Sequence, residues 1–188
     1  MLEAAVGEFL NKGLESGSME NIAKEAQVSK RTLYKYYPNK EAIFDALIEK
    51  LLESACGYTK VLYSKKESLQ TQIEAIIEAK AELLTSDEYI SISRLVLSEV
   101  MKTKKLSEKH LEKFYESELH FLKWIDAAKK DGKITSKQSS ELISNQLHSI
   151  IKGQLFYPVV FGMKTLTKSD IKLAKKIASD FFINSFCS

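Results

Sequence analysis

The chain has 188 residues, of which 44% are hydrophobic and 28% are charged, and its formal net charge at pH 7 is +3. This composition supports a hydrophobic core of ordinary size and excludes disordered, collagen-like and low-complexity chains. Seven glycines and two prolines are too few for the frequent turns of an all-β fold. The small net charge identifies no partner by itself.

Cellular location is predicted from the cysteines and from the absence of long apolar runs. Cys56 and Cys187 match no metal-binding or redox spacing, which favours two reduced thiols. The longest nearly unbroken apolar run, Leu155–Met163, is far shorter than the roughly 20 residues that cross a bilayer. No secretory leader is evident. We therefore expect a cytoplasmic protein without a membrane partner, a metal or a cofactor.

The predicted elements begin with three short helices. Apolar residues recur at helical spacing throughout the chain, which predicts about nine helices and no strand. The first helix ends near Gly13, and helices over 19–26 and 29–36 follow. Ser18 and Ser29 are suited to cap these two helices, because a hydroxyl at the N-cap accepts a hydrogen bond from a free amide of the first turn. Two short helices joined by a tight turn are typical of a helix-turn-helix.

Longer helices follow Pro38. The pattern predicts a helix over 40–63 and others around 69–84, 89–101 and 107–131. A further helix runs from Ser136 or Ser139 to about Leu155, and a last one from Ser169 to Phe186; Pro158 should kink or interrupt its segment. We therefore predict an all-α fold with an N-terminal domain over 1–45 and a C-terminal domain over 46–188.

Positive charge is concentrated on the second of the two short helices. The 17 residues from Lys24 to Lys40 hold five basic side chains against one acidic side chain, a local charge of about +4. Such a patch favours docking on a phosphate backbone. Arg31 is one of only two arginines in the chain, and its guanidinium suits a guanine edge. The predicted outward face carries Lys30, Arg31, Thr32, Lys35 and Tyr36; the predicted core of the motif is Ile22, Ala23, Ala26, Val28 and Leu33.

The segments FLNKG (9–13), SMENIAKEA (18–26) and VSKRTLYKYYPNKEA (28–42) resemble the DNA-binding domain of the TetR family of transcriptional regulators. More loosely, residues 94–162 resemble the regulatory domain of the AefR-like branch. The resemblance implies a homodimeric repressor that binds a palindromic double-stranded DNA operator and is released by a small, largely apolar effector. By position, it assigns base contacts to Lys30 and Arg31, and phosphate contacts to Ser18, Thr32, Tyr34, Tyr36 and Lys40.

Two features depart from the family pattern. Gln27 stands in the turn where the family usually has glycine. A non-glycine residue with positive φ is uncommon and strained, so we expect either an adjusted turn or a small energetic cost there. The first helix carries Glu3 and Glu8 where family members usually have a basic lead-in, which predicts either weaker DNA affinity or a natural start that lies upstream.

The C-terminal domain should supply dimerisation and an effector pocket. Apolar faces of the last helices are candidates for a four-helix interface, although the same faces could be buried within one subunit. The interface candidates are Ile143, Leu147, Ile150, Ile151, Leu155, Phe181 and Phe182. A largely apolar pocket with a few polar groups is expected, and its candidates are Tyr58, Tyr89, Arg94, Glu118, Phe121, Trp124, His148 and Tyr157. For Arg94 we favour a structural pair with Glu99 or Glu118 over contact with an acidic effector.

Other functions have less support in the sequence. Gly162-Met-Lys-Thr lacks the spacing of a nucleotide-binding loop, and His110 and His120 lie on different faces of one predicted helix. We therefore predict a regulator and not an enzyme. The alternative is a DNA-binding architectural or scaffold protein of the same fold without effector control.

Overall fold

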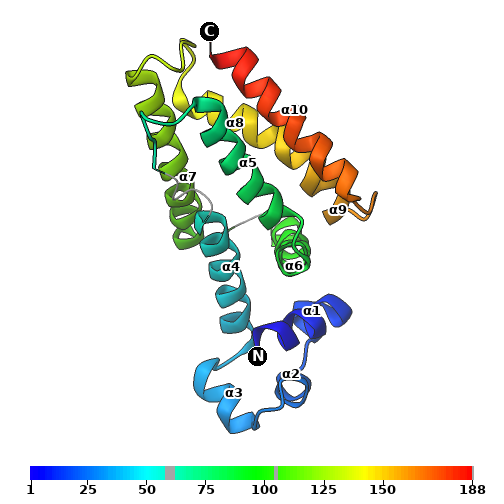
Figure 1. Cartoon of the computed structure of the whole chain (residues 1–188). Helices are drawn as coiled ribbons and strands as arrows, with labels where there is room; N and C mark the ends of the chain where they lie inside the picture. Colours follow the sequence, from blue (N-terminus) through cyan, green and yellow to red (C-terminus); the bar gives the residue numbers. More distant parts are fainter. Residues whose placement is uncertain (58–61, 104–105, 188) are drawn as a thin grey trace. The chain divides into compact units, whose positions relative to one another are not determined.

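The computed structural model describes residues 1–57, 62–103 and 106–187, and these residues form an all-α fold without a strand (Figure 1). The predicted fold class is confirmed. No helix within the described ranges is both long and apolar enough to cross a bilayer. In chain order the elements are α1 Leu2–Ser16, α2 Met19–Glu25, α3 Lys30–Tyr36, α4 Lys40–Gly57, α5 Leu69–Leu84, α6 Asp87–Thr103, α7 Glu108–Lys130, α8 Ser140–Ile151, the π-helix η1 Lys152–Phe156, α9 Tyr157–Val160 and α10 Lys168–Phe186.

The chain divides into two compact units. The first unit consists of Met1–Leu52 and Ser91–Lys113, and the second of Glu53–Ile90 and Phe114–Ser188. A segment from the middle of the chain therefore joins the N-terminal helices, which a division into 1–45 and 46–188 does not anticipate. That linear division stays a prediction.

The first unit is built around one hydrophobic cluster. Phe9 of α1, Ile22 of α2 and Leu33 of α3 are buried together, and α1, α2 and α3 lie around them (Figure 1). Leu47 of α4 and Leu95 of α6 belong to the same cluster. Burying an aliphatic or aromatic side chain of this size contributes about 1.5–3 kcal/mol, so this cluster holds the short helices α2 and α3 in place. In the second unit, α10 packs against α5 and α8.

Two helix ends differ from the prediction. The described part of α4 runs to Gly57, and Tyr63 is not helical, whereas the periodicity predicted a helix to Tyr63. Tyr63 instead donates a 2.6 Å hydrogen bond to Asp131 and packs edge-on against Trp124. Helix α10 is capped by Thr167 in a capping box with Asp170, rather than opening at Ser169.

The expected interruption near Pro158 is present. Helix α8 continues into the five-residue π-helix η1, and Pro158 lies in the first turn of α9 directly after it. Proline has no amide hydrogen and its ring clashes with the carbonyl four residues earlier in a regular α-helix. A wider π-turn before Pro158 accommodates the ring while the chain stays helical.

Candidate nucleic-acid interface and effector site

The turn between α2 and α3 has the geometry that the sequence predicts. Ser18 accepts a hydrogen bond from the Asn21 amide, and Ser29 accepts a 3.0 Å hydrogen bond from the Thr32 amide, so both helices have the expected caps. Gln27 has φ of 55°, so the turn keeps a positive φ at this position and is not adjusted to avoid it. The following amide, that of Val28, donates to the Ala23 carbonyl at 3.0 Å and closes the turn.

Helix α3 has one buried position and an exposed face. Leu33 is fully buried in the first unit, whereas Arg31 is exposed, and Tyr34 and Tyr36 are 48% and 61% exposed. Lys30 is also exposed and forms an ion pair with Glu20 of α2. The caps and the buried leucine fix the orientation of α3, and they leave its cationic and phenolic groups accessible to a ligand.

The other three predicted phosphate contacts are engaged in local interactions. The Thr32 hydroxyl lies 2.8 Å from the Ser29 hydroxyl, and Lys40 donates to the carbonyl of Glu15 near the end of α1. The Ser18 hydroxyl caps α2. A phosphate at these positions would share or replace contacts that already hold the motif together.

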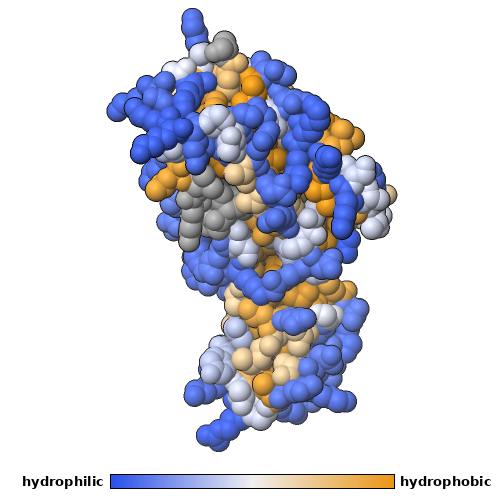
Figure 2. All heavy atoms as spheres, viewed as in Figure 1, coloured by the Kyte–Doolittle hydropathy of each residue, from blue (hydrophilic) through white to orange (hydrophobic). Residues whose placement is uncertain are grey.

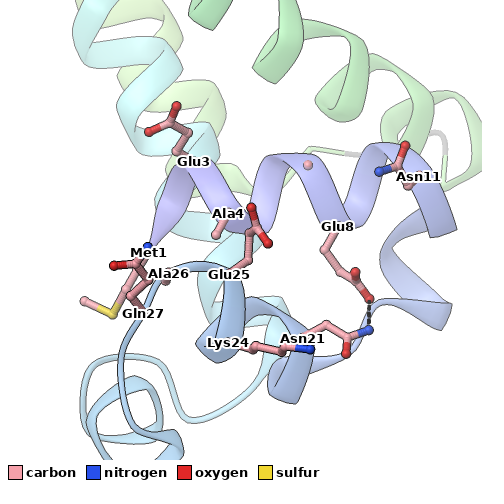
Figure 3. A pocket seen from close by; sticks show the side chains of 11 residues that line it. Met1, Glu3, Ala4, Glu8, Asn11, Asn21, Lys24, Glu25, Ala26 and Gln27 are labelled. Atoms are coloured by element: carbon pink, nitrogen blue, oxygen red, sulfur yellow. Dashed lines mark hydrogen bonds between the residues drawn. The ribbon is translucent and has the colours of Figure 1, made fainter.

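Glu8 has a role that sequence reasoning missed. Its carboxylate oxygen accepts from the Ser18 amide at 3.0 Å, from the Asn21 side chain at 3.2 Å and from Lys12 at 3.1 Å. Figure 3 shows Glu8 reaching from α1 to Asn21 across a polar pocket of about 820 Å³. The backbone hydrogen bond from Ser18 is the main reason that the pKa of Glu8 is lowered. The carboxylate therefore satisfies the N-terminus of α2, where the family resemblance assigns a phosphate contact to Ser18.

A second group of polar side chains lies in the interior of the second unit. Glu118 of α7 accepts a 2.8 Å hydrogen bond from Nδ1 of His148 on α8, and the Ser144 hydroxyl lies 3.5 Å from the same carboxylate oxygen. Lys80 of α5 is 1% exposed, and its charge interacts with that of Glu118. We call Lys80, Glu118, Ser144 and His148 the buried polar cluster.

Aromatic rings adjoin this cluster. Phe121 stacks on His148, with 5.6 Å between the ring centroids. It also stacks on Trp124, with 5.9 Å between the ring centroids. Tyr89 meets Phe156 edge-on at 6.1 Å. The indole nitrogen of Trp124 is buried and has no hydrogen-bond partner among the described residues. An unsatisfied buried donor of this kind carries a desolvation penalty of about 1–3 kcal/mol.

Burial and charge shift the ionisation of the cluster. Burial lowers the pKa of Lys80 to about 7 against the opposing effect of Glu118. Burial also lowers the pKa of His148, although its hydrogen bond to Glu118 acts in the other direction. Burial tends to raise the pKa of Glu118, but the hydrogen bond from His148 and the neighbouring cations outweigh it and lower the pKa. Burial raises the pKa of Tyr89 to about 12.

Known families match both parts of the chain. Residues 1–47 match the family described as bacterial regulatory proteins of the tetR family. Residues 71–186 match the family described as the AefR-like transcriptional repressor, C-terminal domain, which covers more than half of the chain. This chain belongs to the TetR family of transcriptional regulators. Both the family and the AefR-like resemblance of the C-terminal domain are confirmed.

Individual relatives agree with this assignment. The chain is similar to the nucleoid occlusion factor SlmA of Haemophilus ducreyi, with 26% identity over 82% of this chain and 76% of that protein. For SlmA of Actinobacillus pleuropneumoniae serotype 5b the identity is 33% over 41% of this chain. The matched residues span 39% of that relative's length. A crystal structure of a TetR family transcriptional regulator from Pseudomonas syringae pv. tomato has a TM-score of 0.77 at 27% identity, covering 99% of this chain and 94% of that one.

The structure brings together five of the eight pocket candidates of this TetR family member. Tyr89, Glu118, Phe121, Trp124 and His148 are linked by the contacts described above. Their assignment to an effector stays a prediction.

The remaining pocket candidates lie elsewhere. Arg94 is exposed and belongs to the first unit. Its pairing with Glu99 or Glu118 stays a prediction. Tyr157 is exposed and stacks on Phe161. Tyr58 lies outside the described residues.

The predicted dimer interface needs correction at most of its positions. Side chains at five of the seven positions are buried within the chain itself, where they fill the core of the second unit and are not available to a second subunit. Ile150 and Phe181 are half-buried. The five core positions are Ile143, Leu147, Ile151, Leu155 and Phe182.

Lys80 is the important residue of the second unit that sequence reasoning did not select. Its position on α5 lies among the apolar positions that face the core, four residues after Ile76 and three after Ile77. A lysine in register with an apolar stripe is the signal that could have identified it, because lysines are almost never fully buried without a compensating charge.

Proposed function

We propose that this TetR family regulator is a cytoplasmic repressor that binds a palindromic operator as a homodimer and releases it when a small effector enters the second unit. The observation that carries the DNA-binding part is the exposed face of α3, which presents Lys30, Arg31, Tyr34 and Tyr36 on a helix anchored by the buried Leu33. Rigid presentation of cations and phenols fits major-groove binding.

Within this proposal the side chains of α3 divide into two roles. Lys30 and Arg31, in the first turn of α3, read base edges, and Arg31 has the fork geometry that suits guanine. Tyr34 and Tyr36 hold phosphates, together with Thr32, Ser18 and Lys40 after a change of their local partners. Lys30 must likewise leave Glu20, and an exposed ion pair of this kind is weak enough to exchange.

Dimerisation is proposed through the outward faces of α8 and α10. Leu142 of α8 and Leu173 and Ile177 of α10 are exposed, with Leu173 at 58%, and the half-buried Ile150 and Phe181 lie on the same two helices. Figure 2 shows hydrophobic side chains reaching the surface of the second unit among hydrophilic ones. Two copies are needed because a palindromic site presents two half-sites about 34–36 Å apart.

The coupling between effector and DNA is proposed to run through α6 and α4. Leu47 and Ile48 of α4 share one hydrophobic cluster with Ile92 and Leu95 of α6, so α6 cannot shift without disturbing α4. Lys109 at the start of α7 also forms an ion pair with Glu49 of α4. An effector that binds the released state better than the DNA-bound state shifts the population toward release.

A gel-shift assay on DNA from the protein's own promoter region tests the interface. Arg31→Ala and Lys30→Ala should each weaken binding by about 1–3 kcal/mol and relax sequence preference. Lys123→Ala, an exposed lysine on α7 in the second unit, is the matched control and should bind as the unmodified protein does. Unimpaired binding by both α3 variants would overturn the assignment of base contacts.

A second candidate function is DNA binding without effector control. It is favoured by the similarity to proteins named nucleoid occlusion factors, whose name does not describe transcription. Chromosome-wide mapping separates the two: a repressor occupies a few promoter sites, whereas an architectural protein occupies many sites outside promoters.

A further inference from the structure

A groove in the first unit lies between the end of α1, α4, α6 and the start of α7. Its cavity measures about 570 Å³, within the range of roughly 300–1,000 Å³ that is common for small-molecule pockets. The described residues that line it all belong to the first unit. The groove, which we call the α4–α6 groove, is therefore complete within one compact unit.

The inner wall of the α4–α6 groove is apolar. Ile48 of α4 is buried, and Phe44, one turn earlier on the same helix, is half-buried. Every apolar residue of this wall belongs to the hydrophobic cluster of the first unit or packs against it. These residues are Leu14, Phe44, Ile48, Val100 and Leu106. A ligand with a hydrocarbon body would gain free energy here, because contact with this wall removes apolar surface from water.

The outer edge of the groove is acidic. Glu41 and Asp45 of α4 and Glu108 of α7 are exposed carboxylates that line it, and the buried Glu99 of α6 is a fourth. Among the described lining residues there is no lysine and no arginine. Acidic groups beside an apolar wall attract a cation and disfavour an anion.

The lysines near the groove offset only part of this negative charge. Lys102 binds Glu99, with 2.7 Å between Nζ and the carboxylate oxygen. Lys109 forms an ion pair with Glu49, which does not line the groove, and is also attracted by Asp45. An excess of negative charge is left among the described residues at the edge of the groove.

His110 provides an independent sign that the groove holds a ligand. It lines the groove and is only 4% exposed, and its imidazole makes no hydrogen bond with another described residue. Nε2 lies 3.9 Å from the Asp45 carboxylate, which is beyond hydrogen-bond distance. A buried polar group without a hydrogen bond is costly, so a ligand that donates an N–H to this ring would remove the cost.

We propose that the α4–α6 groove is a second ligand site, which binds a small organic cation: an amine with an apolar body. The ammonium lies near Asp45 and Glu108 and donates a hydrogen bond to the imidazole of His110. The apolar body lies against Phe44 and Ile48. A bare metal ion does not fit, because the described residues contain no group of three side chains that could hold one.

This site differs from the effector site proposed in the second unit. It lies in the unit that contains α3, and its occupant would touch both α4 and α6. Ile48 of α4 lines the groove and shares a hydrophobic cluster with Leu33 of α3. An amine in the groove therefore contacts the same packed core that orients α3.

The test compares amines with alcohols of the same carbon skeleton. The full chain, without DNA, is titrated calorimetrically with phenethylamine and octylamine and with phenethyl alcohol and octanol. Methylamine serves as a cation without an apolar body. Charge-assisted hydrogen bonds predict that at least one larger amine binds about 10-fold or more tightly than its alcohol, and the apolar wall predicts that it also binds more tightly than methylamine.

Two double variants locate the binding. Asp45→Asn combined with Glu108→Gln should bring the ratio of amine affinity to alcohol affinity close to one. The matched control is Glu112→Gln combined with Glu116→Gln, which removes two exposed carboxylates of α7 that do not line the groove. The control should keep the full preference for the amine.

Several results would overturn the inference. It fails if neither larger amine is preferred over its alcohol, if methylamine binds as tightly as the larger amines, or if the Asp45 and Glu108 double variant keeps the preference. Equal losses in the two double variants would also overturn it, because they would show a general attraction to acidic surface. No DNA is present in these titrations, so their outcome is separate from that of the operator-binding assay.

Discussion

Replacing Lys80 with methionine should stabilise the folded protein at neutral pH. The side chain is 1% exposed, and burial lowers its pKa from 10.5 to about 7, which measures how strongly the interior disfavours the ammonium. Methionine has a similar length and no charge, so it fills the same space without that penalty. Glu118 keeps His148 and Ser144 as hydrogen-bond donors, so it is not left as an isolated charge.

The expected size of this stabilisation follows from the pKa shift of Lys80. A pKa lowered from 10.5 to about 7 corresponds to roughly 4 kcal/mol of unfavourable free energy at pH 7. This free energy already includes the attraction between Lys80 and Glu118, so we expect a net gain of up to about 4 kcal/mol in the free energy of unfolding. Replacing buried ionic groups by apolar ones of similar volume gives gains in this range.

The stability gained by Lys80→Met should decrease as the pH rises. Because the folded-state pKa lies below the unfolded-state value, the unfolded chain binds more protons between about pH 7 and pH 10.5. The stability of the unmodified protein therefore rises with pH across this window, and the advantage of Lys80→Met shrinks. Tyr89 and Cys187, whose pKa values burial raises to about 12 and about 11, titrate in both proteins and cancel in the difference.

Urea unfolding at pH 6, 7, 8 and 9, at one protein concentration, measures this difference. A fixed concentration is needed because dimerisation makes apparent stability concentration-dependent. Lys123→Met, at an exposed site on the same unit, should change stability by no more than about 0.5 kcal/mol. A Lys80→Met protein that is less stable than the unmodified one at pH 7, or whose stability difference is independent of pH, would refute the reasoning.

Two further predictions concern the first unit. Gln27→Gly should raise the free energy of unfolding by up to about 1 kcal/mol, because glycine adopts φ of 55° without steric strain; a loss of stability in thermal unfolding would contradict this. Glu8→Ala should lower the free energy of unfolding by about 1–2 kcal/mol, because the Ser18 amide and the Asn21 side chain lose their acceptor. In Glu8→Ala the melting temperature should fall and DNA binding in gel shifts should weaken. Unchanged values in both assays would exclude this role of Glu8.

Features that depend on neighbouring residues were predictable from the sequence. The caps at Ser18 and Ser29 each involve atoms within a few positions along the chain. Contacts between distant segments were not predictable. Glu8 reaches a helix ten residues later, and the Tyr63 hydroxyl donates a hydrogen bond to Asp131, 68 positions away.

The predicted dimer interface shows what periodicity can and cannot establish. Apolar spacing identified Ile143, Leu147 and Phe182 as positions that must be buried, and they are. The same spacing is satisfied by burial inside one subunit or between two, because the hydrophobic effect depends on area removed from water and not on which chain covers it. The exposed Leu173 and Ile177 of α10 belong to a different face of the helix, which only the packed structure separates from the core.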